Sequence, residues 1–134
     1  MTYYENIQNN LKSHLRILEK ISEREDLPKK VNEHLDKTSQ ILNEIGGQKP
    51  ENFRMLIEYI NNESRRFGWS FPENSDEEKC ETDFWKLKDS IKKIVQGMTT
   101  NERLYFFGYL EEYENLKPIQ RSERENIELK LFMR

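Results

Sequence analysis

The chain has little of several residues on which common folds and sites depend. Its 134 residues include one cysteine, Cys80, five glycines and no alanine. A single cysteine excludes an internal disulfide and any zinc site built from several cysteines. The few glycines form neither a dinucleotide-binding nor a P-loop motif, and there is no G-x-S-x-G sequence around a nucleophilic serine.

Histidine is also scarce, with only His14 and His34 present. Neither belongs to an HExxH motif or to the Glu-x-x-His pair that builds di-iron sites in helical bundles. His14 lies on the apolar stripe of a predicted helix, and His34 flanks the stripe of the next one. We interpret both as buried or half-buried structural residues, and we expect no metal and no cofactor.

Cys80 is the remaining candidate for covalent catalysis. It lies on an apolar stripe near the start of a predicted helix, where the helix dipole lowers a thiol pKa but burial raises it. No histidine is near it in the sequence. We therefore expect the protein not to be an enzyme. A metal-dependent enzyme using the Glu111, Glu112 and Glu114 cluster is a distant alternative, because a charged helix face produces such clusters by chance.

Long apolar runs and a net positive charge are absent as well. No run approaches the roughly 18 residues of a membrane span, and the net charge is −3. The whole chain therefore has no basic footprint for nucleic acid. We expect a soluble, cytoplasmic protein that neither enters a membrane nor, in the main hypothesis, binds nucleic acid.

What the sequence does contain is helical periodicity. Apolar residues recur at spacings of three and four, which predicts an all-α, single-domain bundle of five or six helices. The predicted ranges are 3–24, 28–45, 51–67, 76–97, 100–116 and 123–133. Three capping-box pairs predict the starts of the last three: Ser75–Glu78, Thr99–Glu102 and Ser122–Glu125. The tail around Leu129 also alternates as a strand would, and the cap favours helix over strand.

The segment TTNERLYFFGYLEEYENLK, residues 99–117, holds five aromatic rings within nine positions. An almost wholly apolar helix is normally central, so we predict that this fifth helix lies near the centre of the bundle. Phe106, Phe107 and Leu110 are predicted core residues. Tyr109 and Tyr113 lie on a tyrosine arc that is either the edge of the core or a binding surface.

The segment ENSDEEKCETD, residues 73–83, holds six acids against one lysine. Acids stabilise a helix N-terminus, but six exceed that need, and an acidic patch complements a basic partner. We hypothesise a non-catalytic protein-binding module, of the inhibitor or immunity type, that masks a basic surface of a protein target. The predicted partner-binding residues are Glu73, Asp76, Glu77, Glu81, Tyr109, Tyr113 and Trp69.

A second hypothesis places the function at basic residues. The sequence RRFGW, residues 65–69, combines Arg65 and Arg66 with aromatic rings at a predicted helix end. The basic C-terminal tail would add further phosphate contacts through Lys117, Arg121, Arg124, Lys130 and Arg134. A regulator that contacts nucleic acid is therefore the alternative, although these cations are few and isolated beside the usual basic stripe.

Overall fold

A computed structural model describes residues 2–23, 28–47, 49, 53–67 and 71–133. Within these ranges the protein is all-helical, which confirms the predicted fold class. The described residues form seven helices rather than the predicted five or six: α1 (Tyr3–Ile21), α2 (Lys29–Gly46), α3 (Arg54–Arg66), α4 (Asp76–Gln96), α5 (Thr100–Phe106), α6 (Leu110–Glu114) and α7 (Arg121–Lys130).

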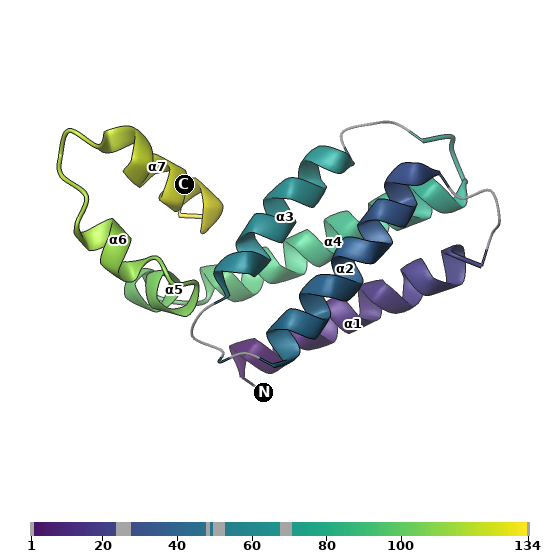
Figure 1. The fold of residues 1–134 in the computed structure, drawn as a ribbon, viewed down its shortest axis with the longest axis horizontal. Helices are drawn as coiled ribbons and strands as arrows, with labels where there is room; N and C mark the ends of the chain where they lie inside the picture. Colours follow the sequence, from purple (N-terminus) through teal and green to yellow (C-terminus); the bar gives the residue numbers. More distant parts are fainter. Residues whose placement is uncertain (1, 24–27, 48, 50–52, 68–70, 134) are drawn as a thin grey trace.

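The four long helices, α1 to α4, lie side by side as a bundle (Figure 1). The three short ones, α5 to α7, lie beyond one end of it, and α7 runs back toward α3. The aromatic segment therefore lies at the end of the bundle, and its predicted central position is wrong. These helices still share a core with the bundle, because Leu104, Phe107 and Ile127 belong to the same apolar cluster as Ile7 and Phe53.

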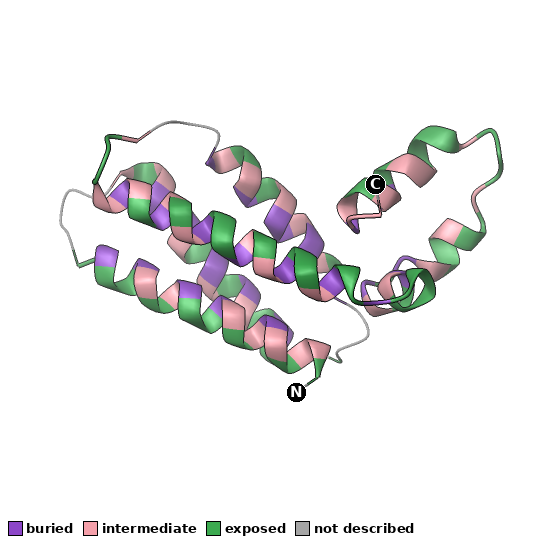
Figure 2. Cartoon of the chain, turned by 180° about the vertical axis from the view of Figure 1, so that it is seen from behind, coloured by how far each residue is buried: buried purple, intermediate pink, exposed green. Residues whose placement is uncertain are grey.

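Each bundle helix buries one stripe and exposes the opposite face (Figure 2). The buried apolar side chains form two separate clusters. The larger one contains Ile7 and Leu11 of α1, and the smaller one contains Leu18 of the same helix. Between these levels α1 carries His14, which is buried. The interior is thus divided by a polar layer.

Helix starts agree only in part with the three predicted capping boxes. At α5 the box is complete, because the Thr99 side chain accepts from the Glu102 N–H and Glu102 accepts from the Thr99 N–H. At α4 the Ser75 side chain accepts from the Glu78 N–H. The Glu78 carboxylate accepts from the N–H of Asn74 rather than from that of Ser75. The third box is wrong: α7 begins at Arg121 without a side-chain cap.

The predicted helix over residues 100–116 is broken in two at Gly108. This glycine has φ 75° and follows the last turn of α5. The Gly108 N–H donates to the Tyr105 carbonyl at 3.1 Å, and the Tyr109 N–H donates to the Leu104 carbonyl at 2.7 Å. This pair of bonds is the Schellman motif. It needs one residue in the left-handed conformation, which glycine adopts without strain.

The break removes the predicted tyrosine arc. Tyr105 is 58% exposed whereas Tyr109 is 1% exposed, so the two rings no longer share a face. Phe107 is fully buried, which confirms it as a core residue. Phe106 and Leu110 are half-buried against the larger cluster.

The C-terminal segment is helical, so the strand alternative is wrong. Its helix covers Arg121–Lys130 rather than the predicted range. Arg103 of α5 donates to the Leu131 and Phe132 carbonyls that follow α7, at 3.4 and 3.1 Å. The α7 end is therefore fixed to α5 by a cation that satisfies terminal carbonyls.

Candidate functional site

The polar layer of the bundle is a chain of four side chains, one from each long helix. His14 Nδ1 lies 2.6 Å from Oδ2 of Asp83, and His14 Nε2 lies 2.7 Å from Nε2 of His34. His34 Nδ1 lies 2.9 Å from Oε1 of Glu63. The chain therefore crosses the bundle in the order α4, α1, α2, α3.

The Glu63 end of this chain continues to the surface. Arg66 Nε donates to Glu63 Oε1 at 2.8 Å, and its Nη1 donates to Glu33 of α2. The Glu63 side chain is 2% exposed, so its charge is buried and paired rather than solvated. Removing one partner of such a pair costs far more than the intact pair contributes.

A hydroxyl pair lies against His34 on the same layer. Thr38 Oγ1 lies 2.7 Å from the Tyr59 hydroxyl and also donates to the His34 carbonyl at 2.8 Å. Among the side chains that the structure describes, no buried nitrogen or oxygen lacks a hydrogen-bond partner. A satisfied polar layer of this kind favours one packing of the helices over others.

Burial and neighbouring charges set the titration of this layer. Burial lowers the pKa of His34, and the charge of His14 lowers it further, against the hydrogen bond to Glu63 that raises it. For Glu63 burial would raise the pKa, but hydrogen bonds from His34 and Arg66 bring it below its usual range. His34 is thus held neutral beside an ionised carboxylate.

Both histidines are buried, as the sequence interpretation expects of structural residues. Sequence reasoning did not predict that they bond to each other, nor that Asp83 and Glu63 complete the chain. In the part of the chain that the structure describes, no group of three or more His, Cys, Asp or Glu side chains is arranged to hold a metal ion.

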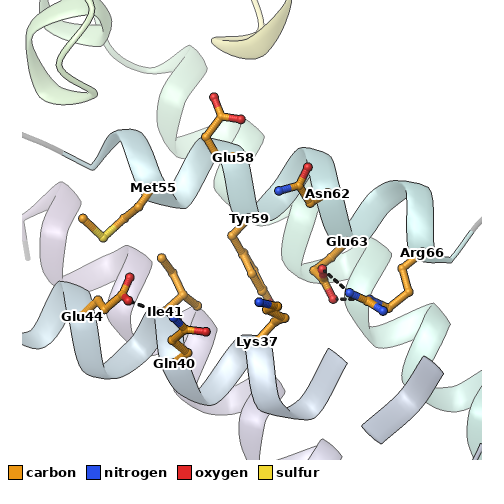
Figure 3. A pocket seen from close by; sticks show the side chains of 10 residues that line it. All are labelled: Lys37, Gln40, Ile41, Glu44, Met55, Glu58, Tyr59, Asn62, Glu63 and Arg66. Atoms are coloured by element: carbon orange, nitrogen blue, oxygen red, sulfur yellow. Dashed lines mark hydrogen bonds and ion pairs between the residues drawn. The ribbon is translucent and has the colours of Figure 1, made fainter. Parts of the chain in front are cut away.

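A groove runs along the surface between α2 and α3, with a volume of about 480 Å³ (Figure 3). Ile41, Met55 and Tyr59 point into it, whereas Glu58 points away from α2. Glu63 and Arg66 line one end, so the buried chain reaches the groove there. Their polar atoms are already bonded to one another.

Cys80 is fully buried on α4, in the smaller apolar cluster, as its stripe position predicts. Burial raises the pKa of its thiol to about 12, with a further rise from the negative charge of Asp83. The thiolate is the reactive form of cysteine. At neutral pH this side chain is an apolar core residue.

The acidic segment is only partly available to a partner. Glu73 is exposed, and Asp76 lies 3.9 Å from Lys79 across one turn. Glu81 accepts from the Trp85 indole at 3.4 Å. Glu77 is 6% exposed, so burial largely prevents its carboxylate from contacting a basic surface.

The aromatic members of the predicted binding set do not form one surface. The hydroxyl of buried Tyr109 donates to Glu58 at 3.1 Å, and the Arg54 guanidinium lies 4.1 Å from its ring centroid. Tyr113 is half-buried beneath Arg124, at 4.6 Å. Trp69 lies outside the described residues.

The structure brings a different aromatic ring to the acidic segment. Trp85 of α4 is 39% exposed and lies one turn after Glu81. With Phe71, Glu78 and Thr82 these two residues line a hollow of about 250 Å³. The spacing from Glu81 to Trp85 is the sequence signal that could have identified this surface.

The basic residues of the nucleic-acid hypothesis are mostly engaged within the chain. Arg66 bonds to Glu63 and Glu33, and Lys130 bonds to Glu58 at 2.9 Å. Arg121 bonds to Glu125 at 2.9 Å. Arg134 lies outside the described residues. Two of the tail cations, Arg121 and Lys130, are therefore paired with carboxylates, and Arg124 donates to the Leu116 carbonyl.

Comparison with models of known protein families, with curated proteins and with solved structures gave no match to this chain. None of the helices in the described ranges has both the length and the apolar character that crossing a membrane requires. Function must therefore be argued from the geometry of the chain itself.

Proposed function

We propose that the protein is a non-catalytic protein-binding module that receives a basic surface at the start of α4. The observation that supports it most directly is the exposed Trp85 ring beside the carboxylates of Glu78 and Glu81. Aromatic rings are enriched at protein interfaces. A cationic side chain is attracted both by the face of an indole and by a neighbouring carboxylate.

An intramolecular contact illustrates this chemistry. Lys88 Nζ lies 5.3 Å from the centroid of the Trp85 ring, within the range of a cation–π interaction. Burial lowers the pKa of Lys88, and repulsion from Lys92 adds to this effect. A lysine or arginine of a partner would contact the same ring from the side of Glu81.

A non-catalytic role is supported by where the reactive side chains lie. His14, His34 and Cys80 are the residues of this chain that most often serve as base or nucleophile, and each is at most 1% exposed. A catalytic group must reach its substrate within hydrogen-bonding distance. In this proposal the three residues contribute to folding alone.

The specific form that we propose is an inhibitor or immunity-type protein that masks a basic surface of its target. Rim charges act mainly on association rate, whereas a buried aromatic anchor acts on dissociation. Glu73 and Glu81 would then steer the encounter, and Trp85 would hold the complex. A cytoplasmic location belongs to the same proposal, since a lone thiol remains reduced there.

The test is affinity capture of the target from extract of the native host, followed by binding kinetics with the purified target. Glu73→Lys/Glu81→Lys should slow association, and Trp85→Ala should speed dissociation. The matched control is Glu111→Lys/Glu114→Lys, which changes net charge equally on the exposed face of α6. Equal effects of both charge reversals would contradict the assigned surface, and an acidic target would contradict the proposed partner.

A further inference from the structure

The chain from Asp83 to Glu63 consists of three hydrogen bonds that connect four groups. Each bond needs one proton, and an ionised carboxylate supplies none. The three protons therefore belong to the imidazole rings: one on each Nδ1 and one between the two Nε2 atoms. Two neutral imidazoles carry only two ring protons. The intact chain thus requires one extra proton and one positive charge on the histidine pair.

The middle bond has a distinct place in the fold. The Asp83–His14 bond joins α4 to α1, and the His34–Glu63 bond joins α2 to α3. The His14–His34 bond connects these two halves of the bundle. A fourth proton would put N–H groups on both facing Nε2 atoms. Loss of the third would leave either two lone pairs facing each other or an unprotonated Nδ1 facing a carboxylate.

We propose that the Asp83–His14–His34–Glu63 chain is a pH-sensitive lock across the bundle, in which all three bonds are made only while the histidine pair carries one shared proton. Acid breaks the lock by adding a proton to the pair, and alkali breaks it by removing one. The device acts inside the fold and is independent of the proposed binding surface at Trp85.

The groups around the pair are consistent with a single charge. The titratable and charged groups that face it come from α2, α3 and α4: Glu33, Tyr59, Glu63, Arg66, Cys80 and Asp83. Burial raises the pKa of Tyr59 and Cys80, so both remain neutral near neutral pH. Arg66 is shared between buried Glu63 and the more exposed Glu33, and Asp83 is the anion that contacts the pair from the opposite end of the chain.

The direction of the His34 shift indicates which Nε2 accepts in the middle bond. Because burial lowers the pKa of His34, its Nε2 is the acceptor. His14 then donates from Nδ1 to Asp83 and from Nε2 to the lone pair of His34 Nε2. The Asp83 side chain is 23% exposed, so solvent also contacts the anion.

A lock of this kind predicts a bell-shaped dependence of stability on pH. Two unfolded histidines together hold one proton at their ordinary pKa of about 6.5, and the folded pair also holds one. The slope of stability with pH is therefore zero near pH 6.5. The unfolding equilibrium constant should rise about threefold at one pH unit on either side.

The sign of each limb follows from the proton count. Below pH about 6.5 the unfolded chain binds more protons than the folded pair, so stability falls with falling pH. Above it the unfolded chain binds fewer protons, so stability falls with rising pH. A pair of independent, neutral, buried histidines would give the acid limb alone.

The first experiment is nitrogen NMR of the imidazoles in the native protein at pH about 6.5, the ordinary histidine pKa. The expected result is three protonated ring nitrogens and one unprotonated Nε2, assigned to His34. Four protonated nitrogens, or only two, would overturn the proposal. This measurement needs no substitution and does not depend on the folding of a variant.

The second experiment is urea unfolding from pH about 5.5 to 7.5, one unit on either side of the ordinary histidine pKa. In Asp83→Asn the amide can donate to His14 Nδ1, so the chain no longer needs the third ring proton. The alkaline limb should flatten while the acid limb remains. Tyr59→Phe is the matched control, because it removes a hydroxyl of the same layer that bonds to Thr38 rather than to an imidazole nitrogen, and it should keep both limbs.

Two results of the unfolding experiment would contradict the lock. A monotonic wild-type profile would show that the pair does not keep one proton through this range. An Asp83→Asn profile that keeps the wild-type alkaline limb while nitrogen NMR shows His14 Nδ1 unprotonated would show that the limb has another origin. Both results are independent of any partner, so they leave the proposed binding function unaffected.

Discussion

His14 and His34 lie on different helices, twenty positions apart in the sequence, and their Nε2 atoms are 2.7 Å apart in a buried layer. Their ring centroids are 5.0 Å apart at an interplanar angle of 59°. The two rings separate an apolar cluster around Leu18 and Phe84 from a larger one around Leu11 and Ile41. Their bond is thus a specific contact at the middle of the polar layer between two apolar clusters.

A double-mutant cycle should show this bond as a strong coupling. His14→Leu alone leaves His34 Nε2 without its partner, and His34→Leu alone leaves His14 Nε2 and Glu63 short of theirs. Each single change should cost ~2–5 kcal/mol of unfolding free energy. The double change should cost less than the sum by ~1–3 kcal/mol, measured by urea unfolding at one pH. Strict additivity would show that the two rings do not depend on each other.

The helical fold could be predicted because its signals are local. Stripes at spacings of three and four and the Thr99 cap act within one helix, and the structure confirms them. The polar chain depends on residues 69, 20 and 29 positions apart. Periodicity places a side chain on a face but does not say which side chain faces it across the core. The position of His14 on an apolar stripe indicated that it is buried, but the sequence did not indicate its partners.

The prediction of one helix over the aromatic segment was wrong for a different reason. Its residues fit a helix at every position except Gly108, and a helix interior tolerates one glycine at a cost of about 1 kcal/mol. Tertiary packing decided the outcome, because breaking the helix buries both Phe107 and Tyr109. Similarly, Ser122 and Glu125 have the spacing of a capping box, but α7 already begins at Arg121, so Ser122 lies inside the helix.

Gly108 and Gly46 should respond to alanine in opposite directions. Gly108 has φ 75°, where a Cβ clashes with the backbone, so Gly108→Ala should cost ~1–2 kcal/mol. Gly46 is the last residue of α2, and a Cβ atom added there would lie in open space. Gly46→Ala should therefore stabilise by up to ~1 kcal/mol. Thermal unfolding of the two variants compares them directly, and a stabilising Gly108→Ala would contradict the helix break.

The aromatic rings of α5 and the turn after it should divide by burial. Phe107 is fully buried, so Phe107→Ala should cost ~3–5 kcal/mol of unfolding free energy. Tyr105 is 58% exposed, so Tyr105→Ala should change it by no more than about 0.5 kcal/mol. Urea unfolding of the pair would test the assigned orientation of α5. A larger loss of unfolding free energy for Tyr105→Ala than for Phe107→Ala would contradict this orientation.

Tyr109 should be sensitive to truncation of its ring and only mildly sensitive to loss of its hydroxyl. Glu58, which accepts from the hydroxyl, also accepts from Lys130, so Tyr109→Phe leaves that carboxylate with a partner. The expected cost is about 1 kcal/mol. Tyr109→Ala removes a buried ring and its contact with Arg54, with an expected cost of ~3–5 kcal/mol. Equal costs would show that the hydroxyl, rather than the ring, fixes this turn.

The buried thiol of Cys80 provides a separate test of packing, in labelling and in pH dependence. Thiol reagents should react slowly with the native protein and rapidly once it is unfolded, because the native side chain has no solvent exposure. Burial raises the thiol pKa to about 12, above its unfolded value. The contribution to stability is therefore complete below the unfolded pKa and is lost as pH rises through the range between the two values. Between pH about 8.5 and 9.5 this loss should be about 1 kcal/mol in wild type relative to Cys80→Ala, in which no thiol titrates. Fast labelling of the native protein, or the same alkaline profile in wild type and Cys80→Ala, would show that the thiol is not sealed in the core beside Phe84.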